Sequence, residues 1–112
     1  MANSIQKQMQ FLMYSTPNED VKVSALIKDE SIWLTQKAMG ELFGCSPDNV
    51  GLHLKNVYAD GELSKESTTE EISVVQQEGS RSVKRDVLFY NLDAIISVGY
   101  RISSARATQF RI

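Results

Sequence analysis

This chain of 112 residues has a single cysteine, no long apolar run and no excess of positive charge. Its single cysteine, Cys45, cannot form an internal disulfide, which favours a reducing cytoplasm. The polar start, residues 1–8, is unlike a signal peptide, and no stretch approaches the roughly 18 apolar residues of a membrane span. We therefore expect a cytoplasmic protein with no membrane partner.

Patterns for catalysis or metal binding are also lacking. One histidine, His53, and one cysteine are too few for the three or four protein ligands of a zinc site. The sequence contains no glycine-rich phosphate loop and no carboxylate pair with supporting residues. We expect no enzymatic activity, no catalytic residue, no metal and no cofactor in this chain.

The distribution of charge along the sequence is more informative than the net charge. The net charge of −2 is unusual for a protein that binds nucleic acid. Acidic residues dominate from Gly61 to Ser80, however, whereas basic residues dominate from Arg81 to Ile112. This asymmetry is compatible with one positive face. Ordinary solvated surface charge remains the alternative.

A first helix is predicted to begin after Thr35, whose hydroxyl can cap the free amides of the opening turn. Gly44 can adopt the left-handed conformation that ends a helix. Gly40 fits a place where this helix approaches a second one closely. The apolar stripe of the first helix is Ala38, Met39, Leu42 and Phe43.

A second helix is predicted only two residues later. Ser46 is a good N-cap, Pro47 suits the first helical position, and Asp48 favours the helix dipole. Gly61 is the expected stop. The inward stripe is Val50, Leu54 and Val57. Two short helices joined by a turn of this length are typical of a helix-turn-helix.

Strands are predicted on both sides of the helix pair. The segments in chain order are a flexible tail (1–8), three strands of a small antiparallel sheet (10–14, 21–27, 31–34), a polar loop (62–69), and a hairpin (71–77 with 82–90) turning at Gly79. A third helix follows Asn91 with the stripe Leu92, Ile95, Ile96 and Gly99, breaks at residues 102–104, and is succeeded by another helix from Ala105.

A hairpin after a helix-turn-helix predicts an α+β domain over residues 9–112, resembling a winged helix with a small antiparallel sheet. We expect it to be the front part of a longer protein. The predicted partner is double-stranded DNA, read by a homodimer because one helix-turn-helix reads few bases. The candidate DNA contacts are Gln36, Lys37, Ser46, Asp48, Asn49, Leu52, Lys55 and Asn56 around the second helix, and Arg81, Lys84 and Arg85 on the hairpin.

Several blocks of the sequence resemble the RhuM virulence-protein family. They are residues 33–37, 41–44, 53–56 and 61–63, and, most closely, Tyr90–Arg101 and Thr108–Ile112. The resemblance extends over about residues 11–112. It implies a larger bacterial protein whose N-terminal part binds DNA and whose activity is poorly defined.

Two residues of the second helix depart from the expected pattern. Gly51 weakens a helix by about 1 kcal/mol relative to alanine, and Leu52 offers only apolar contact to a base. The alternative hypothesis is therefore a protein–protein interaction or dimerisation module, antirepressor-like, that does not touch DNA. The isoelectric point of about 5.3 favours this alternative.

Overall fold

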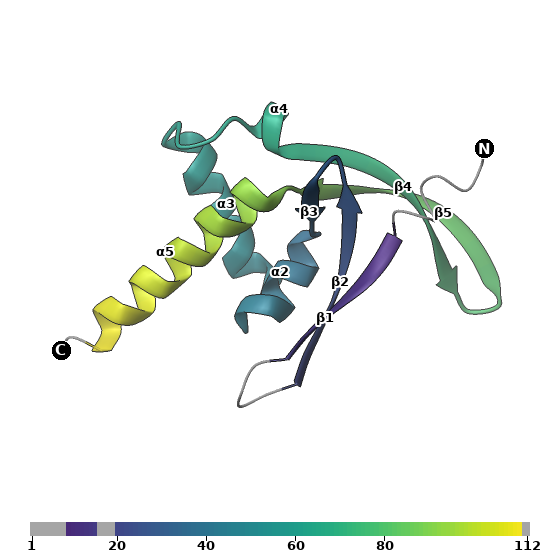
Figure 1. Ribbon diagram of the computed structural model, residues 1–112, viewed down its shortest axis with the longest axis horizontal. Helices are drawn as coiled ribbons and strands as arrows, with labels where there is room; N and C mark the ends of the chain where they lie inside the picture. Colours follow the sequence, from purple (N-terminus) through teal and green to yellow (C-terminus); the bar gives the residue numbers. More distant parts are fainter. Residues whose placement is uncertain (1–8, 16–19, 111–112) are drawn as a thin grey trace.

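The computed structural model describes residues 9–15 and 20–110, so the expected flexible tail 1–8 lies outside the described residues. The strands are β1 (Met9–Ser15), β2 (Asp20–Lys28), β3 (Ser31–Trp33), β4 (Thr69–Glu78) and β5 (Arg81–Tyr90). The helices are α2 (Gln36–Phe43), α3 (Pro47–Ala59), α4 (Lys65–Thr68) and α5 (Leu92–Phe110). The fold is α+β, as expected, and has two antiparallel sheets rather than one. The molecule is elongated, 54 × 34 × 27 Å (Figure 1).

The first sheet has the order β1–β2–β3 and is antiparallel throughout. Its register places Leu12 opposite Val23 and Leu26 opposite Trp33. The turn from β2 to β3 has only two residues, Asp29 and Glu30, with φ of 51° and 57°. Two consecutive positive φ values give the twist that a two-residue hairpin requires.

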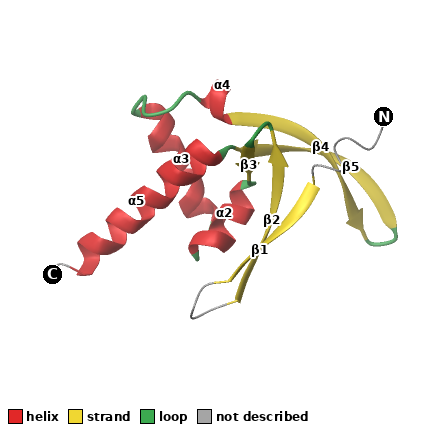
Figure 2. Ribbon diagram, viewed as in Figure 1, coloured by secondary structure: helices red, strands yellow, loops and turns green. Residues whose placement is uncertain are grey.

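The second sheet is the hairpin β4–β5, which turns at Gly79 with φ of 65°. Its ten paired positions run from Thr69 opposite Tyr90 to Glu78 opposite Arg81. Leu34 and Tyr90 exchange two main-chain hydrogen bonds of 2.9 and 2.8 Å, which join the two sheets. Figure 2 shows the helices gathered at one end of the molecule while the hairpin extends from the other.

The main core lies where β2, α2, α3 and α5 meet. Met39, Val50 and Val98 are completely buried there, one from each helix. This burial follows from the apolar periodicity of each helix, since residues three or four apart share a face. The predicted stripes of α2 and α3 are thus on the inside, although Leu42 and Phe43 are half-buried.

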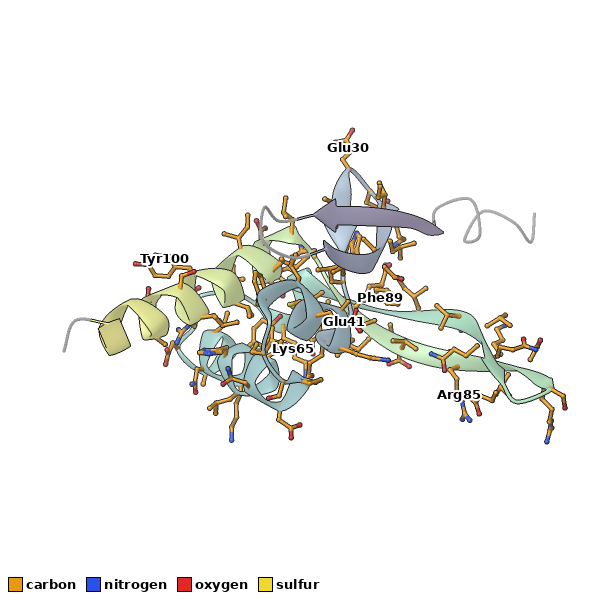
Figure 3. The ribbon with its side chains drawn as sticks, turned by 90° about the horizontal axis from the view of Figure 1, so that it is seen from below. Glu30, Glu41, Lys65, Arg85, Phe89 and Tyr100 are labelled. Carbon is orange, nitrogen blue, oxygen red and sulfur yellow. The ribbon has the colours of Figure 1, made fainter. Side chains whose placement is uncertain are left out.

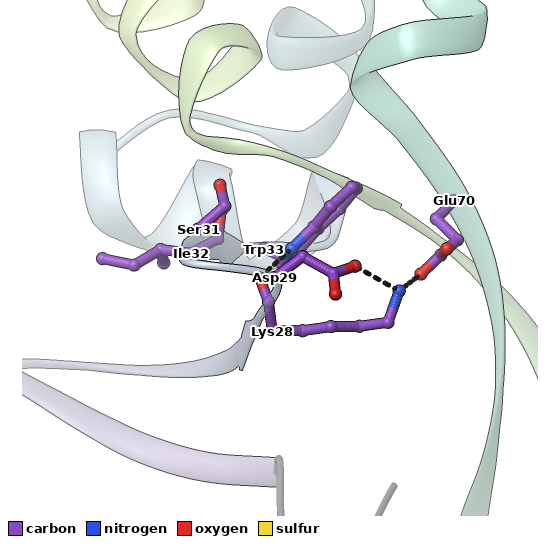
Figure 4. A network of polar contacts seen from close by, with 6 residues as sticks. All are labelled: Lys28, Asp29, Ser31, Ile32, Trp33 and Glu70. Atoms are coloured by element: carbon purple, nitrogen blue, oxygen red, sulfur yellow. Dashed lines mark hydrogen bonds and ion pairs between the residues drawn. The ribbon is translucent and has the colours of Figure 1, made fainter.

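A second core cluster attaches the base of the hairpin to the first sheet. Leu26 and Trp33 pack there against Ile72 and Phe89. Beside this cluster Lys28 forms ion pairs with Asp29 and Glu70, and its ammonium lies 5.4 Å from the centre of the Trp33 ring (Figure 4). The Trp33 indole N–H donates a 3.0 Å hydrogen bond to the Lys28 carbonyl, so the buried ring is fully satisfied.

The structure corrects three predictions after Gly61. The predicted break at residues 102–104 is wrong, because α5 is one continuous helix and Ile102, 4% exposed, extends its buried face. That face is Ala94, Ile95, Val98 and Ile102, whereas Leu92 and Ile96 of the predicted stripe are 41% and 59% exposed. The predicted polar loop contains the short helix α4.

Candidate functional site

The helix pair α2–α3 is held by the caps that the sequence predicts. The Thr35 hydroxyl accepts a 3.1 Å hydrogen bond from the Ala38 amide, and Gly44 ends α2 with φ of 68°. The Ser46 hydroxyl accepts a 3.1 Å hydrogen bond from the Asn49 amide and so begins α3. Capping at both ends of so short a turn fixes the direction in which α3 leaves α2.

Two glycines allow the helices to approach each other closely. A β-carbon at Gly40 would lie 2.7 Å from the main-chain oxygen of Cys45, which confirms the close approach predicted there. A β-carbon at Gly51 would lie 2.7 Å from Nε2 of Gln36. The same Nε2 donates a 2.7 Å hydrogen bond to the carbonyl of Pro47. Gln36, a predicted phosphate contact, therefore links α2 to the first turn of α3, and Gly51 leaves room for that link.

The predicted contact residues of α3 share one exposed face. Val50, Leu54 and Val57 are buried against the core. The opposite side is exposed, and Leu52 keeps 56% of its surface there. Its members are Asp48, Asn49, Leu52, Lys55 and Asn56. Lys37 on α2 is exposed as well, and Ser46 is the cap at the beginning of the helix. We call Asp48, Asn49, Leu52, Lys55 and Asn56 the outer face of α3.

The three basic residues of the hairpin lie apart from α3. Figures 1 and 3 show the hairpin extending away from the helices, with Arg85 near the middle of its length, opposite Val74. Arg85 is engaged by Glu78 through two hydrogen bonds of 3.0 and 2.9 Å. Lys84 precedes Arg85 on the same strand, so the two side chains point to opposite faces of the hairpin. Arg81 and Lys84 are exposed and form no ion pair with any described residue.

A pocket beside the outer face of α3 was not predicted. It has a volume of about 290 Å³ and lies between α2, α3, α4 and β5. Lys55, Tyr58, Lys65 and Tyr90 are among its lining residues. Lys65 was not predicted as a site residue, because the segment that forms α4 was predicted to be a polar loop. Ser64, directly before α4, is a residue type that often begins a helix. Tyr90 was seen only as the end of a strand.

An apolar cavity of about 410 Å³ lies between β2, β3, α2 and α5, with Ile32, Phe43 and Ile95 in its wall. Across the parts of the chain that the structure describes, no three His, Cys, Asp or Glu side chains are grouped as a metal site would require. Within the same described residues, none of the helices has the length and apolar character to span a membrane.

Comparison with known proteins gives one family. The model of the virulence protein RhuM family matches residues 67–112, the segment with β4, β5 and α5. No curated protein and no solved structure matches the chain. The blocks Tyr90–Arg101 and Thr108–Ile112 lie inside the match, whereas those before residue 67 lie outside it. The chain is thus similar over residues 67–112 to the virulence protein RhuM family, which confirms the resemblance for this segment.

Proposed function

We propose that this chain is a DNA-binding module of the winged-helix type, in which α3 enters the major groove and the β4–β5 hairpin contacts backbone phosphates. The observation that carries the proposal is the outer face of α3. One side of this helix is exposed, whereas Val50, Leu54 and Val57 anchor the other side in the core. A helix presented in this way matches the dimensions of a major groove.

The side chains of this face have chemistry suited to base edges. Asn49 and Asn56 carry amides that can pair with adenine, and Lys55 can reach guanine or a phosphate. Leu52 can contact the methyl group of thymine. Asp48 places a negative charge at the start of the outer face and repels phosphate there. A phosphate is therefore favoured only near Lys55, toward the end of the face. Sequence preference would therefore come from the two asparagines and Leu52.

The hairpin would supply contacts that do not depend on sequence. Arg81 and Lys84 are exposed cations that no described carboxylate neutralises. Arg85 would have to exchange Glu78 for a phosphate, which lowers its contribution. A single helix pair reads only a few base pairs, so we propose that two copies bind together, as a homodimer, in a bacterial cytoplasm.

The experiment is fluorescence anisotropy of a labelled random duplex at 50 and 200 mM salt. Binding through phosphates gives an affinity that falls steeply over this range. Replacing Lys55, Lys84 and Arg85 together by glutamate should abolish binding. The matched control exchanges Lys55→Arg, Lys84→Arg and Arg85→Lys, which keeps the charges and should keep most of the affinity. An affinity that ignores salt, or that survives the glutamate variant, contradicts the proposal.

A second candidate function is a protein-interaction module of the same architecture, without DNA. Its support is apolar exposure: Leu52 is 56% exposed, and Leu92, Ile96 and Tyr100, four residues apart on α5, are 41%, 59% and 74% exposed. Light scattering tests it. A salt-insensitive oligomer that dissociates on Leu52→Asp, with no response to added duplex, would favour this function over DNA binding.

A further inference from the structure

The pocket between α2, α3, α4 and β5 has an unusual lining. Lys55 comes from α3 and Lys65 from α4 (Figure 3 labels Lys65), and both are exposed. None of the residues that line the pocket is acidic, and neither lysine forms an ion pair with a described residue. The pocket therefore concentrates positive charge without an internal counter-ion, which favours an anion.

The hydroxyl of Tyr58, in the same pocket, is already committed to the protein. Thr68 Oγ1 donates its hydrogen to the Ser64 carbonyl at 2.7 Å. The 2.9 Å contact between the Tyr58 hydroxyl and Thr68 Oγ1 must then use the hydrogen of Tyr58. This chain of bonds fixes the Tyr58 ring as a wall of the pocket. Tyr58 cannot at the same time donate to a ligand.

Tyr90 has the opposite character. The residue is only 6% exposed, and its main chain is held by Leu34. No described group forms a hydrogen bond with its hydroxyl, and this oxygen keeps contact with solvent although the ring is buried. Burial, and secondarily the nearby Tyr58, raise the pKa of Tyr90, so the hydroxyl keeps its hydrogen and remains a donor. A donor with no partner in the protein, belonging to a residue that lines a cationic pocket, is available to an acceptor that enters from solvent.

We propose that this pocket binds a phosphate group, with Lys55 and Lys65 supplying charge and the Tyr90 hydroxyl donating a hydrogen bond. The inference rests on the proposed function in one respect: the phosphate is expected to belong to a DNA strand lying along α3, because Lys55 serves both surfaces. A volume of about 290 Å³ accommodates a phosphate with part of its sugar but is small for a whole nucleotide.

Two substitutions test the pocket without disturbing the core. Tyr90→Phe removes only the hydroxyl, which has no described partner to lose, and should weaken duplex binding about tenfold. Lys65→Gln should lower the slope of log affinity against log salt by about 0.9, the loss of one phosphate contact. Tyr100→Phe, which removes an exposed hydroxyl on α5, is the control and should change neither quantity.

Titration with inorganic phosphate separates the pocket from the DNA proposal. We expect amide chemical shifts to move near residues 55, 65 and 90, to be lost in Tyr90→Phe, and to persist in Arg81→Gln. Duplex binding weakened by both pocket variants supports the pocket with a strand phosphate as ligand. Phosphate shifts without any duplex binding support the pocket with a free phosphate compound and contradict the proposed function. Duplex binding that both variants leave unchanged, without phosphate shifts, overturns the pocket alone.

Discussion

Gln36 on α2 donates a 2.7 Å hydrogen bond to the carbonyl of Pro47 in the first turn of α3, across the space that a side chain at Gly51 would fill. Together with the caps at Gly44 and Ser46, this contact fixes the angle between the two helices. It also explains why α3 contains a glycine at position 51, although glycine weakens helices. A larger side chain there would collide with the Gln36 amide.

Gly51→Ala should stabilise the protein less than helix propensity alone predicts. Propensity favours alanine by about 1 kcal/mol, but the new β-carbon displaces the Gln36 amide and weakens its bond to Pro47, which offsets about 0.5–1.5 kcal/mol. In a Gln36→Ala background the full gain should appear. Urea unfolding of the wild type, both single variants and the double variant measures this difference. Equal effects of Gly51→Ala in the two backgrounds would show that the contact has no energetic weight.

Gly40→Ala should destabilise the protein by about 1–3 kcal/mol. Its β-carbon meets the main-chain oxygen of Cys45, which cannot rotate away as the end of the Gln36 side chain can. The comparison with Gly51→Ala is therefore a matched pair: one helix glycine faces backbone, the other a flexible side chain. Thermal unfolding of both variants checks the prediction, and a neutral Gly40→Ala would contradict the close approach of α2 and the turn.

The ion pair between Lys28 and Glu70 should lose its contribution to stability in alkaline solution. The hydrogen bond to Glu70, reinforced by Asp29 and opposed by desolvation, raises the pKa of Lys28 above its ordinary value of 10.5. A raised lysine pKa contributes stability that is complete below 10.5 and declines as pH rises through the folded value. The measurement is the difference in unfolding free energy between wild type and Lys28→Met from pH 8 to 11.

Tyr58 and Tyr90 also have raised pKa values, mainly through burial. Their contribution to the stability of the protein therefore also declines as pH rises. Both tyrosines are present in the wild type and in Lys28→Met, so their effect cancels in the difference. A gap between the two proteins that stays constant up to pH 11 would show that Lys28 contributes by packing on Trp33 rather than by charge.

Glu78→Gln should increase the affinity for duplex DNA. Glu78 holds Arg85 through two hydrogen bonds, and its neutralisation frees that guanidinium for a phosphate. The salt slope should then become steeper by about 0.9. Glu66→Gln, which removes a carboxylate from α4 instead, controls for the change in net charge. If the two variants behave alike, the effect is one of overall charge and not of Arg85.

The local signals in the sequence predicted local structure well. Thr35, Gly44 and Ser46 act as caps because the unpaired amides and carbonyls of helix ends have few other partners. The serines at 103 and 104 were misread as a break, since serine favours caps, yet the buried Ile102 keeps the helix continuous there. Tertiary packing overrode propensity at that point.

The site was harder to predict because its contacts join residues far apart in the sequence. Neither the link from Gln36 to Pro47 nor the pairing of Arg85 with Glu78 follows from periodicity. Tyr90 and Lys65 meet in one pocket only because β5 and α4 pack beside α3. The separation of the hairpin from α3 depends on strand length, since ten paired positions carry its basic end well beyond the helices.

The hairpin is anchored at its base and free at its tip. Leu26, Trp33, Ile72 and Phe89 clamp its base, while every residue from Val75 to Ser82 is exposed. Bending of such an arm grows with distance from the clamp, so its free end can follow a curved or irregular surface at little energetic cost. The rate of amide hydrogen exchange should accordingly rise step by step from Phe89 toward Gly79. Binding to a surface should slow exchange most at the tip of the hairpin.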